Sequence, residues 1–264
     1  MRISCIIPTC NRKEYLIDSL GSVINQTRAP DEIIIINNGI EKIKLPCEIM
    51  KKVSVYDIIP FAGASQARNF GAIFAKGEYL AFLDDDDFWS SEYLKNVSDA
   101  LSEGNECVIS RLDKIQSGKI SKYKNSYQKL NIKNLFIFNP GVTGSNIVIK
   151  KDIFVKLGGF DIRLVTSEDK SLIIDAIINN VRIKVLPENQ AIFRTDILRK
   201  GLGENSEKMS EGIRCFLYKY SKLMTLKERL LNYLKIHKYR FQSGSVFSLI
   251  PFLFLYLLKK IKII

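Results

Sequence analysis

Histidine is nearly absent from this sequence, since His237 is the single one among 264 residues. A triad of serine, histidine and carboxylate could be built only around that residue, and a metal site with several histidines is excluded. Five cysteines are scattered along the chain, with no CxxC pair and no metal-ligand spacing: Cys5, Cys10, Cys47, Cys107 and Cys215. A metal site could therefore be built only from carboxylates, whose hard oxygens favour Mg²⁺ or Mn²⁺ over zinc or copper.

Other absences narrow the class of protein. No secretory leader precedes the first apolar run, so we expect the chain in the reducing cytoplasm. No GxGxxG follows either early apolar run, which argues against a dinucleotide-dependent oxidoreductase. The remaining composition, 46% hydrophobic and 26% charged residues, is typical of a globular chain with room for one large domain or two small ones.

The formal charge of +12 has three ordinary explanations: nucleic acid, an anionic membrane surface, or phosphorylated substrates. Its distribution is uneven. Acidic residues concentrate before residue 110 and around Glu168, whereas the stretch 214–240 is rich in lysine and arginine. This asymmetry indicates a basic, helical appendage on a nearly neutral body.

Buried strands and helices alternate in the first ninety residues. Continuous apolar runs over 3–7 and 33–36 predict two buried parallel strands, and apolar residues at helical spacing over 16–24 predict a helix between them. The pattern repeats as a strand over 53–59, a helix over 65–75 and a strand over 79–83. These repeats predict an α/β fold with a Rossmann-like, mostly parallel sheet flanked by helices.

The rest of the chain is less regular. We expect a helix from residue 90 to 101, strands near 107–110, 146–149 and 182–186, and a helix beginning near Ser167. The polar stretch 114–133 has weak periodicity and predicts a loop-rich segment.

An apolar run over 246–258 follows the basic stretch and precedes Lys259 and Lys260. As a helix it would reach roughly 20 Å, against about 30 Å of hydrocarbon in a bilayer, and Pro251 interrupts it. An interfacial helix on an anionic membrane therefore fits better than a membrane span. The alternative is a helix packed on the body of the protein.

Four consecutive aspartates, Asp84 to Asp87, follow the predicted strand over 79–83. Ligands of open α/β sheets bind beyond the carboxyl ends of the strands, where the segments 8–12 and 37–39 should also lie. Adjacent carboxylates repel one another, and a divalent cation relieves that repulsion. Because alternate residues of an extended backbone point the same way, Asp84 and Asp86 can share one side of a metal site. A solvated acidic loop or helix N-terminus is the alternative.

Several segments resemble the family 2 glycosyltransferases of GT-A fold. ISCIIPTCNR resembles their opening strand, DEIIIINNG their second strand, and GASQARNFGAIFAKGEYLAFLDDDDFW their central signature. VTGSNIVIKKDIFVKLGGFD followed by SED resembles their acceptor-side region. The resemblance covers roughly residues 1–195. It implies a nucleotide-sugar-binding subdomain over 1–110 and a subdomain over 111–200 that binds the acceptor and carries the catalytic base. The basic and apolar stretches described above, and not the resemblance, predict a helical C-terminal region over 201–264 that associates with membranes.

The resemblance implies roles for residues of each motif. Residues expected to contact the sugar nucleotide are Pro8, Thr9, Asn11, Asn37, Asn38, Arg68, Asp84 and Asp85. Asp84 and Asp86, with Asp87 as a further candidate, are expected to hold Mn²⁺ or Mg²⁺ against the donor diphosphate. Asp169 matches the general base that takes the proton of the acceptor hydroxyl, with Glu168 as the fallback, and attack from the opposite face would invert the anomeric centre. Complementing the charge of a helix N-terminus is the other interpretation of Asp169.

Two positions depart from the family pattern. Many relatives have aspartate at the end of the second strand to contact the nucleobase, whereas this chain has Asn37, whose amide can accept or donate. The family often has a YRxH-like segment near residues 193–195, and no histidine follows here. The amide oxygen of Asn37 can still accept the N–H of uracil, so uridine stays the expected nucleoside, and no contact from that histidine is expected.

The function predicted by these features is transfer of a hexose from a UDP-sugar to a sugar acceptor. UDP-glucose or UDP-galactose with β linkage is favoured, and the expected acceptor is a polyprenyl diphosphate-linked saccharide in O-antigen or capsule assembly, at the inner face of the cytoplasmic membrane. A nucleic-acid-binding protein is the alternative that the charge suggests, but the chain has no recognised nucleic-acid motif, and we expect no such partner. A nucleotidyltransferase would need a glycine-rich phosphate loop where the chain has TCNR. A noncatalytic GT-A-like binding domain is the last alternative.

Overall fold

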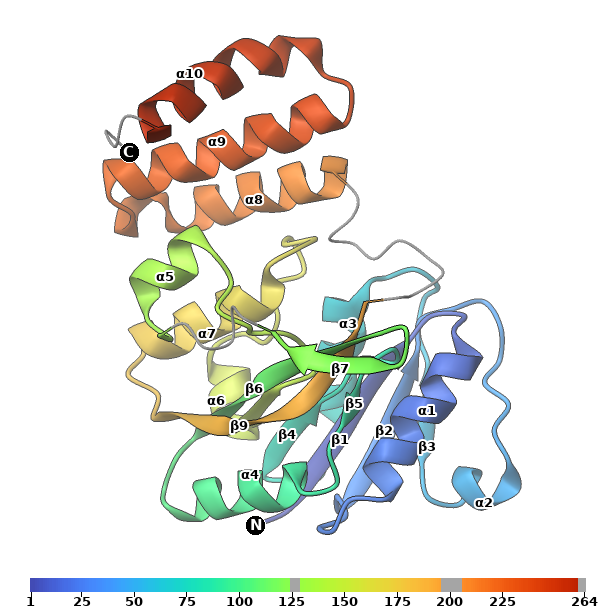
Figure 1. The fold of residues 1–264 in the computed structure, drawn as a ribbon. Helices are drawn as coiled ribbons and strands as arrows, with labels where there is room; N and C mark the ends of the chain where they lie inside the picture. Colours follow the sequence, from blue (N-terminus) through green and yellow to red (C-terminus); the bar gives the residue numbers. More distant parts are fainter. Residues whose placement is uncertain (124–128, 196–205, 261–264) are drawn as a thin grey trace.

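The computed structural model describes residues 1–123, 129–195 and 206–260 (Figure 1). Within these residues nine strands form one sheet, in the order β3-β2-β1-β4-β8-β6-β9-β5, with β7 paired to β6. Helices cover both faces of the sheet, and a stack of three helices lies beyond one end of it (Figure 1). The predicted α/β class is confirmed.

The first four strands are parallel, as the apolar runs predicted: β1 (Ile3–Thr9), β2 (Glu32–Asn37), β3 (Ser54–Asp57) and β4 (Tyr79–Phe82). Every residue of β1 is buried. Successive side chains of a strand point to opposite faces, so Ile3, Cys5 and Ile7 pack on one side of the sheet, while Ile6 packs on the other.

Each face of the sheet has its own helices. α1 (Lys13–Ile24) and α4 (Tyr93–Ser102) bury their apolar stripes against the Ile3 side. α3 (Ala64–Phe74), α5 (Ile132–Ile137), α6 (Lys151–Lys156) and α7 (Glu168–Ile178) pack on the Ile6 side. Gly71 of α3 permits close packing, because a Cβ there would lie 2.5 Å from Ile6 Cγ2. A short helix, α2 (Cys47–Met50), precedes β3.

The second half of the sheet is mixed. β8 (Ile147–Lys150) is antiparallel to β4 and to β6 (Cys107–Gln116), whereas β9 (Ile183–Arg194) is parallel to β6. The two-residue strand β5 (Phe88–Trp89) pairs with the end of β9. Since β6 continues through residues 110 and 111, the proposed subdomain boundary falls inside a strand, and the division stays a prediction.

Two sequence predictions were wrong in detail. The stretch 114–133 contains the end of β6, the antiparallel strand β7 (Lys119–Lys122) and the start of α5, although residues 124–128 lie outside the described part. All four residues of β7 are exposed, so it lacks the apolar alternation that marks a strand. β9 extends far beyond residue 186, because register shifts opposite Ser110 and Arg111 let pairing continue past Pro187.

The C-terminal region forms three stacked helices, α8 (Ser206–Tyr220), α9 (Leu226–Gln242) and α10 (Leu249–Lys260), with 3-10 turns η3 (Ser221–Leu223) and η4 (Val246–Ser248) between them (Figure 1). Thr225 and Glu228 form a capping box that fixes the start of α9. Leu234 of α9 and Leu255 of α10 are buried together. None of the helices in the described ranges combines the length and the hydropathy that crossing a membrane requires.

Candidate active site

A pocket of about 460 Å³ lies at the carboxyl ends of β1 and β4. The strand order reverses at β1, since β2 and β3 lie on one side of it and β4 on the other. Ligands of open α/β sheets bind at such a reversal. The lining comes from β1 and its loop, the residue after β2, the segment before α3, α3 itself and the acidic run, with two later residues: Pro8, Thr9, Cys10, Arg12, Asn38, Phe61, Gly63, Ala64, Arg68, Asp84, Asp85, Asp86, Glu168 and Lys208.

Asp84, Asp86 and Asp87 each bring a carboxylate oxygen within 4.8 Å of the other two. The backbone N–H of Asp87 donates to the carbonyl oxygen of Asp84 at 3.1 Å, so the run turns and its ends approach. This turn adds Asp87 to the pair that simple alternation would bring together. Three carboxylate oxygens at this spacing fit one Mg²⁺ or Mn²⁺ ion, with positions left over for water and phosphate.

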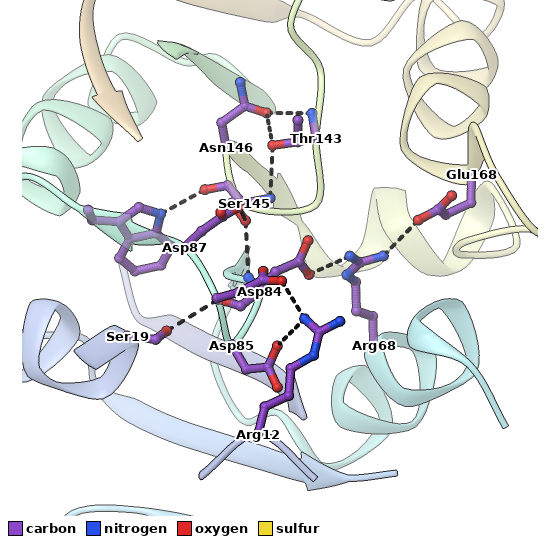
Figure 2. A network of polar contacts seen from close by, with 12 residues as sticks. Arg12, Ser19, Arg68, Asp84, Asp85, Asp87, Thr143, Ser145, Asn146 and Glu168 are labelled. Atoms are coloured by element: carbon purple, nitrogen blue, oxygen red, sulfur yellow. Dashed lines mark hydrogen bonds and ion pairs between the residues drawn. The ribbon is translucent and has the colours of Figure 1, made fainter. Parts of the chain in front are cut away.

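Asp85 faces the end of β1 and lies outside this cluster (Figure 2). Thr9 Oγ1 donates to its Oδ2 at 2.7 Å, and Arg12 Nη1 lies 3.3 Å from its Oδ1. Burial, with the charge of Asp86 adding to it, raises the pKa of Asp85 to about 7. These two contacts connect the β1 loop to the acidic run through Asp85.

Asp87 is held by two later segments of the chain. Ser145 Oγ donates to its Oδ2 at 2.5 Å and accepts the backbone N–H of Asp84 at 3.1 Å (Figure 2). The backbone N–H of Arg194 donates to the other carboxylate oxygen at 3.1 Å. Burial, then the charges of Asp86 and Asp84, raises the pKa of Asp87 well above its usual range. A bound cation would reverse that shift by favouring the ionised form.

Arg68 projects from α3 between the acidic run and α7. Its Nη1 donates to Glu168 Oε1 at 3.0 Å, its Nη2 pairs with Asp84, and its carbon Cζ lies 5.1 Å from the centre of the Phe160 ring. Burial opposes its charge, but the two carboxylates outweigh that cost and raise the pKa of Arg68. The Arg68 guanidinium therefore places two N–H donor groups with a permanent positive charge in the pocket wall, and this geometry is suited to binding a phosphate.

The two candidate bases begin α7. Glu168 lines the pocket and pairs with Arg68, whereas Asp169, the next residue, is not among the lining residues. The backbone N–H of Lys170 donates to Asp169 Oδ1 at 2.6 Å. Burial, then the charge of Glu168, raises the pKa of Asp169 to about 7. A carboxyl with such a pKa is suited to accepting a proton near neutral pH.

The asparagines that end β2 differ in their surroundings. Asn37 Nδ2 donates to Asp57 Oδ1 at 2.7 Å and its Oδ1 accepts the Gly39 N–H at 3.0 Å, so the amide is engaged within the protein. Asn38 lines the main pocket, and its buried Oδ1 has no hydrogen-bond partner in the described ranges. The nucleobase contact of Asn37 stays a prediction. Of the two side chains, Asn38 is the one whose amide oxygen is still able to accept a hydrogen bond from a ligand.

Asn11 is not among the residues that line the main pocket, and it lines a smaller neighbouring one together with Asn37. Its backbone has a left-handed φ of 55°, which asparagine tolerates better than most residues. Its Oδ1 accepts the N–H of Ile40 at 3.0 Å. This hydrogen bond connects the loop after β1 to the loop after β2.

The sequence did not predict three residues of the site, two that line the pocket and one that holds the acidic run. Arg12 pairs with Asp85 and Asp86, yet it follows the predicted strand only as one loop residue among several. Ser145 carries no distinguishing local signal, although it lies in the VTGSN segment that resembles the acceptor-side region of the family. Lys208 comes from α8, whose entry into the pocket wall the basic composition of that region could not reveal.

Known proteins resemble this chain along more than half of its length. The profile of glycosyl transferase family 2 matches residues 4–158. An uncharacterized glycosyltransferase of Haemophilus influenzae is 27% identical over 173 residues, covering 63% of this chain and 59% of that protein. One of Rickettsia bellii is 30% identical over 168 residues, covering 58% of this chain and 24% of that protein. The chain therefore spans less than two thirds of the length of these relatives.

Solved structures share the fold. The S. aureus TarS 1-349 structure has a TM-score of 0.60 at 16% identity, covering 90% of this chain and 81% of that one. The mannosyltransferase PcManGT of Pyrobaculum calidifontis, solved with GDP-Man and Mn²⁺, has a TM-score of 0.65 at 14% identity, covering 94% of this chain and 77% of that one. Because the family profile covers more than half of the chain, and the acidic run lies at the strand ends of the matched region, the chain belongs to glycosyl transferase family 2.

Proposed function

We propose that this chain is an inverting, metal-dependent glycosyltransferase that moves a hexose from a UDP-sugar to the hydroxyl of a sugar acceptor. One observation carries the proposal: the carboxylate cluster of Asp84, Asp86 and Asp87 lies across one pocket from Glu168, with Arg68 between them. This arrangement separates a region that would bind the leaving diphosphate from a region that would accept the proton of the acceptor hydroxyl.

The donor side would use charge. Asp84, Asp86 and Asp87 would hold Mg²⁺ or Mn²⁺, which when bound supplies positive charge to the leaving phosphate oxygens. Arg68 and Arg12 reach the same pocket, and each guanidinium can bind phosphate. Pro8, Thr9 and Asn38 line the part nearest β1 and β2, where we assign the nucleoside.

The acceptor side would use Asp169 as the base. The acceptor oxygen forms a bond to the anomeric carbon as the bond from that carbon to the phosphate oxygen breaks. The electron pair leaves with UDP, and the acceptor proton passes to Asp169. Attack opposite the leaving group inverts the anomeric centre. Glu168, paired with Arg68, would position that arginine.

The donor assignment draws on relatives as well as on the pocket. TarS has been solved with UDP-GlcNAc, and PcManGT with GDP-Man and Mn²⁺. Both ligands are nucleotide sugars, which supports that donor class for this chain. We favour UDP-glucose or UDP-galactose, with Asn38 Oδ1 accepting the imino N–H of uracil.

We assign the acceptor to the inner face of the cytoplasmic membrane, as a polyprenyl diphosphate-linked saccharide. α10 and the turn before it expose an apolar face at helical spacing: Val246, Phe247, Ile250, Leu253, Phe254 and Leu257. Phe247 is 95% exposed, and Lys259 and Lys260 end the helix. An apolar face flanked by lysines suits an anionic bilayer surface.

The product class draws on a relative. A Bacillus subtilis protein, 32% identical over 113 residues, has a name that assigns it provisionally to teichuronic acid biosynthesis, which supports surface polysaccharide as the product class.

Transfer of radiolabelled sugar from a panel of UDP-sugars to a synthetic saccharide on a diphosphate lipid tests the proposal, with and without Mn²⁺. We expect a metal-dependent product with one donor. The absence of metal-dependent product with every UDP-sugar would overturn the proposal.

A further inference from the structure

A second pocket, of about 700 Å³, lies between the turn over 161–164 and one face of α8 and η3. It shares no lining residue with the active-site pocket. Its walls carry several cations: Asp161, Arg163, Leu164, Arg214, Cys215, Tyr218, Lys219, Ser221 and Lys222.

The charges of this pocket are unbalanced. Arg163 binds Asp161 through two hydrogen bonds of 2.8 and 2.9 Å, and Lys219 Nζ lies 3.2 Å from the same carboxylate. These contacts lower the pKa of Asp161, so it stays ionised and holds the turn against α8. Among the lining residues one carboxylate thus accompanies four cations, although Lys219 also pairs with Asp175, outside the lining, at 2.8 Å. Arg214 and Lys222 make no ion pair with Asp161.

Arg214 and Lys222 are available to a ligand. Arg214 is largely exposed, and its ion pair with Glu211 at 3.3 Å is a surface pair of little strength. Lys222 makes no ion pair within the described ranges and is exposed. Arg214, Tyr218 and Lys222 follow one another at intervals of four, which places them along one side of the α8 and η3 segment.

Apolar side chains border the same corner of the molecule. Tyr218, a pocket residue, is 88% exposed, and Leu223 and Leu226, which follow the last pocket residue, are 55% and 64% exposed. Exposed leucines beside a basic pocket form an amphipathic surface. Such a surface fits a ligand with an anionic head and an apolar tail.

α8 connects this pocket to the active site. Lys208 lines the active-site pocket, and Arg214 and Tyr218 follow six and ten residues later on the same helix. At 1.5 Å per residue they lie about 9 and 15 Å further along the axis. That separation leaves room for a saccharide between a head group in the basic pocket and the active-site pocket at Lys208.

We propose that the pocket of Arg214 and Lys222 binds the phosphate groups of a lipid-linked acceptor, with the lipid chain leaving over Leu223 and Leu226. This inference rests on the proposed function and names the acceptor group that it recognises. Arg214 and Lys222 bind the phosphates, Tyr218 offers its ring to the first sugar, and Asp161 positions Arg163 and Lys219 at the pocket wall.

Direct binding tests the inference without requiring transfer. Calorimetric titration of the full chain with geranyl diphosphate should show binding, and geraniol, which lacks phosphate, should not bind. The double variant R214E/K222E should weaken binding of geranyl diphosphate at least tenfold, because two charge-assisted contacts become repulsive. The matched control K133E/K156E makes the same change in net charge at exposed lysines outside the pocket and should bind as the wild type does.

Transfer assays then separate this inference from the proposed function. With wild-type activity established, R214E/K222E should lose at least tenfold in transfer to a diphosphate-linked acceptor and retain transfer to the same sugar without phosphate. Equal loss with both acceptors, or unchanged binding of geranyl diphosphate by R214E/K222E, would overturn the inference. Inactivity of the wild type with every donor and acceptor would instead count against the proposed function, and the binding titration would still decide the role of the pocket.

Discussion

Arg68 and Glu168 form an ion pair of 3.0 Å that joins α3 to the start of α7, across 100 positions of sequence. The same guanidinium contacts Asp84, so one side chain connects the proposed metal cluster to the helix that carries the proposed base. A donor phosphate that binds Arg68 would compete with both carboxylates. Donor binding could therefore alter the surroundings of Asp169, which directly follows Glu168.

Gly144 permits this placement of Arg68, and replacing it tests the role of the guanidinium. A Cβ at position 144 would lie 2.2 Å from Arg68 Nη2, so Gly144→Ala should displace the guanidinium from the pocket wall. We expect UDP to bind at least about tenfold more weakly, because a charge-assisted contact is lost. Titration of UDP in the presence of Mn²⁺ measures the effect.

Gly21→Ala is the matched control for that substitution. A Cβ at position 21, within α1, has no neighbour within 4 Å, and alanine is the better helix former. The control should keep wild-type affinity for UDP and gain up to about 1 kcal/mol of stability. Wild-type affinity in Gly144→Ala would show that Arg68 does not contact the donor.

Removing one carboxylate from the cluster should abolish the effect of metal on stability. Mn²⁺ relieves the repulsion among Asp84, Asp86 and Asp87, so it should raise the melting temperature of the wild type. Asp86→Ala should abolish that increase and also abolish transfer. Burial and the charge of Asp84 raise the pKa of Asp86, so its removal should not destabilise the metal-free protein.

A thermal melt with and without Mn²⁺ measures this difference. Asp99→Ala, at an exposed position of α4, removes the same charge elsewhere and should leave the metal effect intact. A full increase in melting temperature in Asp86→Ala would exclude this residue from the metal site.

Local patterns predicted the half of the fold that carries the acidic run. β1, β2 and β4 are fully or almost fully buried, so their apolar runs are continuous and their ends are evident in the sequence. The position of Asp84 and Asp86 at a ligand-binding edge followed from that pattern alone. By contrast β7 is exposed on both faces and leaves no such signal.

Contacts between distant segments were beyond prediction from one sequence. Ser145 lies 58 positions from Asp87, which it binds, and no periodicity links the two residues. The engagement of Asn37 by Asp57 depends on the register of β2 against β3, which pairs these two residues directly. The resemblance to a family identified which residues could meet, and tertiary packing determined how they do.

Lys170 provides a test of the surroundings of the base through stability. Burial, then the charge of Lys235, lowers the pKa of Lys170 to about 7, and its ammonium lies over the Phe216 ring. Because the folded-state pKa is below the unfolded one, Lys170 lowers stability progressively as the pH falls from about 10 to 7. Lys170→Met should therefore be more stable than the wild type at pH 7 by at least about 1 kcal/mol, with the gain shrinking toward pH 10.

Denaturant titrations at several pH values measure that gain. Lys156→Met, at an exposed position of α6, is the control and should show no comparable pH-dependent gain. A gain in Lys170→Met that does not change between pH 7 and 10 would contradict the depressed pKa.

The pH dependence of transfer distinguishes the two candidate bases. Since the pKa of Asp169 is raised to about 7 and a base must be deprotonated to act, kcat/KM should rise about tenfold per pH unit below 7 and level off above it. Asp169→Asn should lose at least about 100-fold in kcat, retain UDP binding and lose this pH dependence.

Glu168→Gln should act differently, because it releases Arg68 rather than removing the proton acceptor. It should raise KM for the donor more than it lowers kcat and keep the rise near pH 7. If instead Glu168→Gln removes the rise and Asp169→Asn keeps it, Glu168 is the base and Asp169 serves only the start of α7.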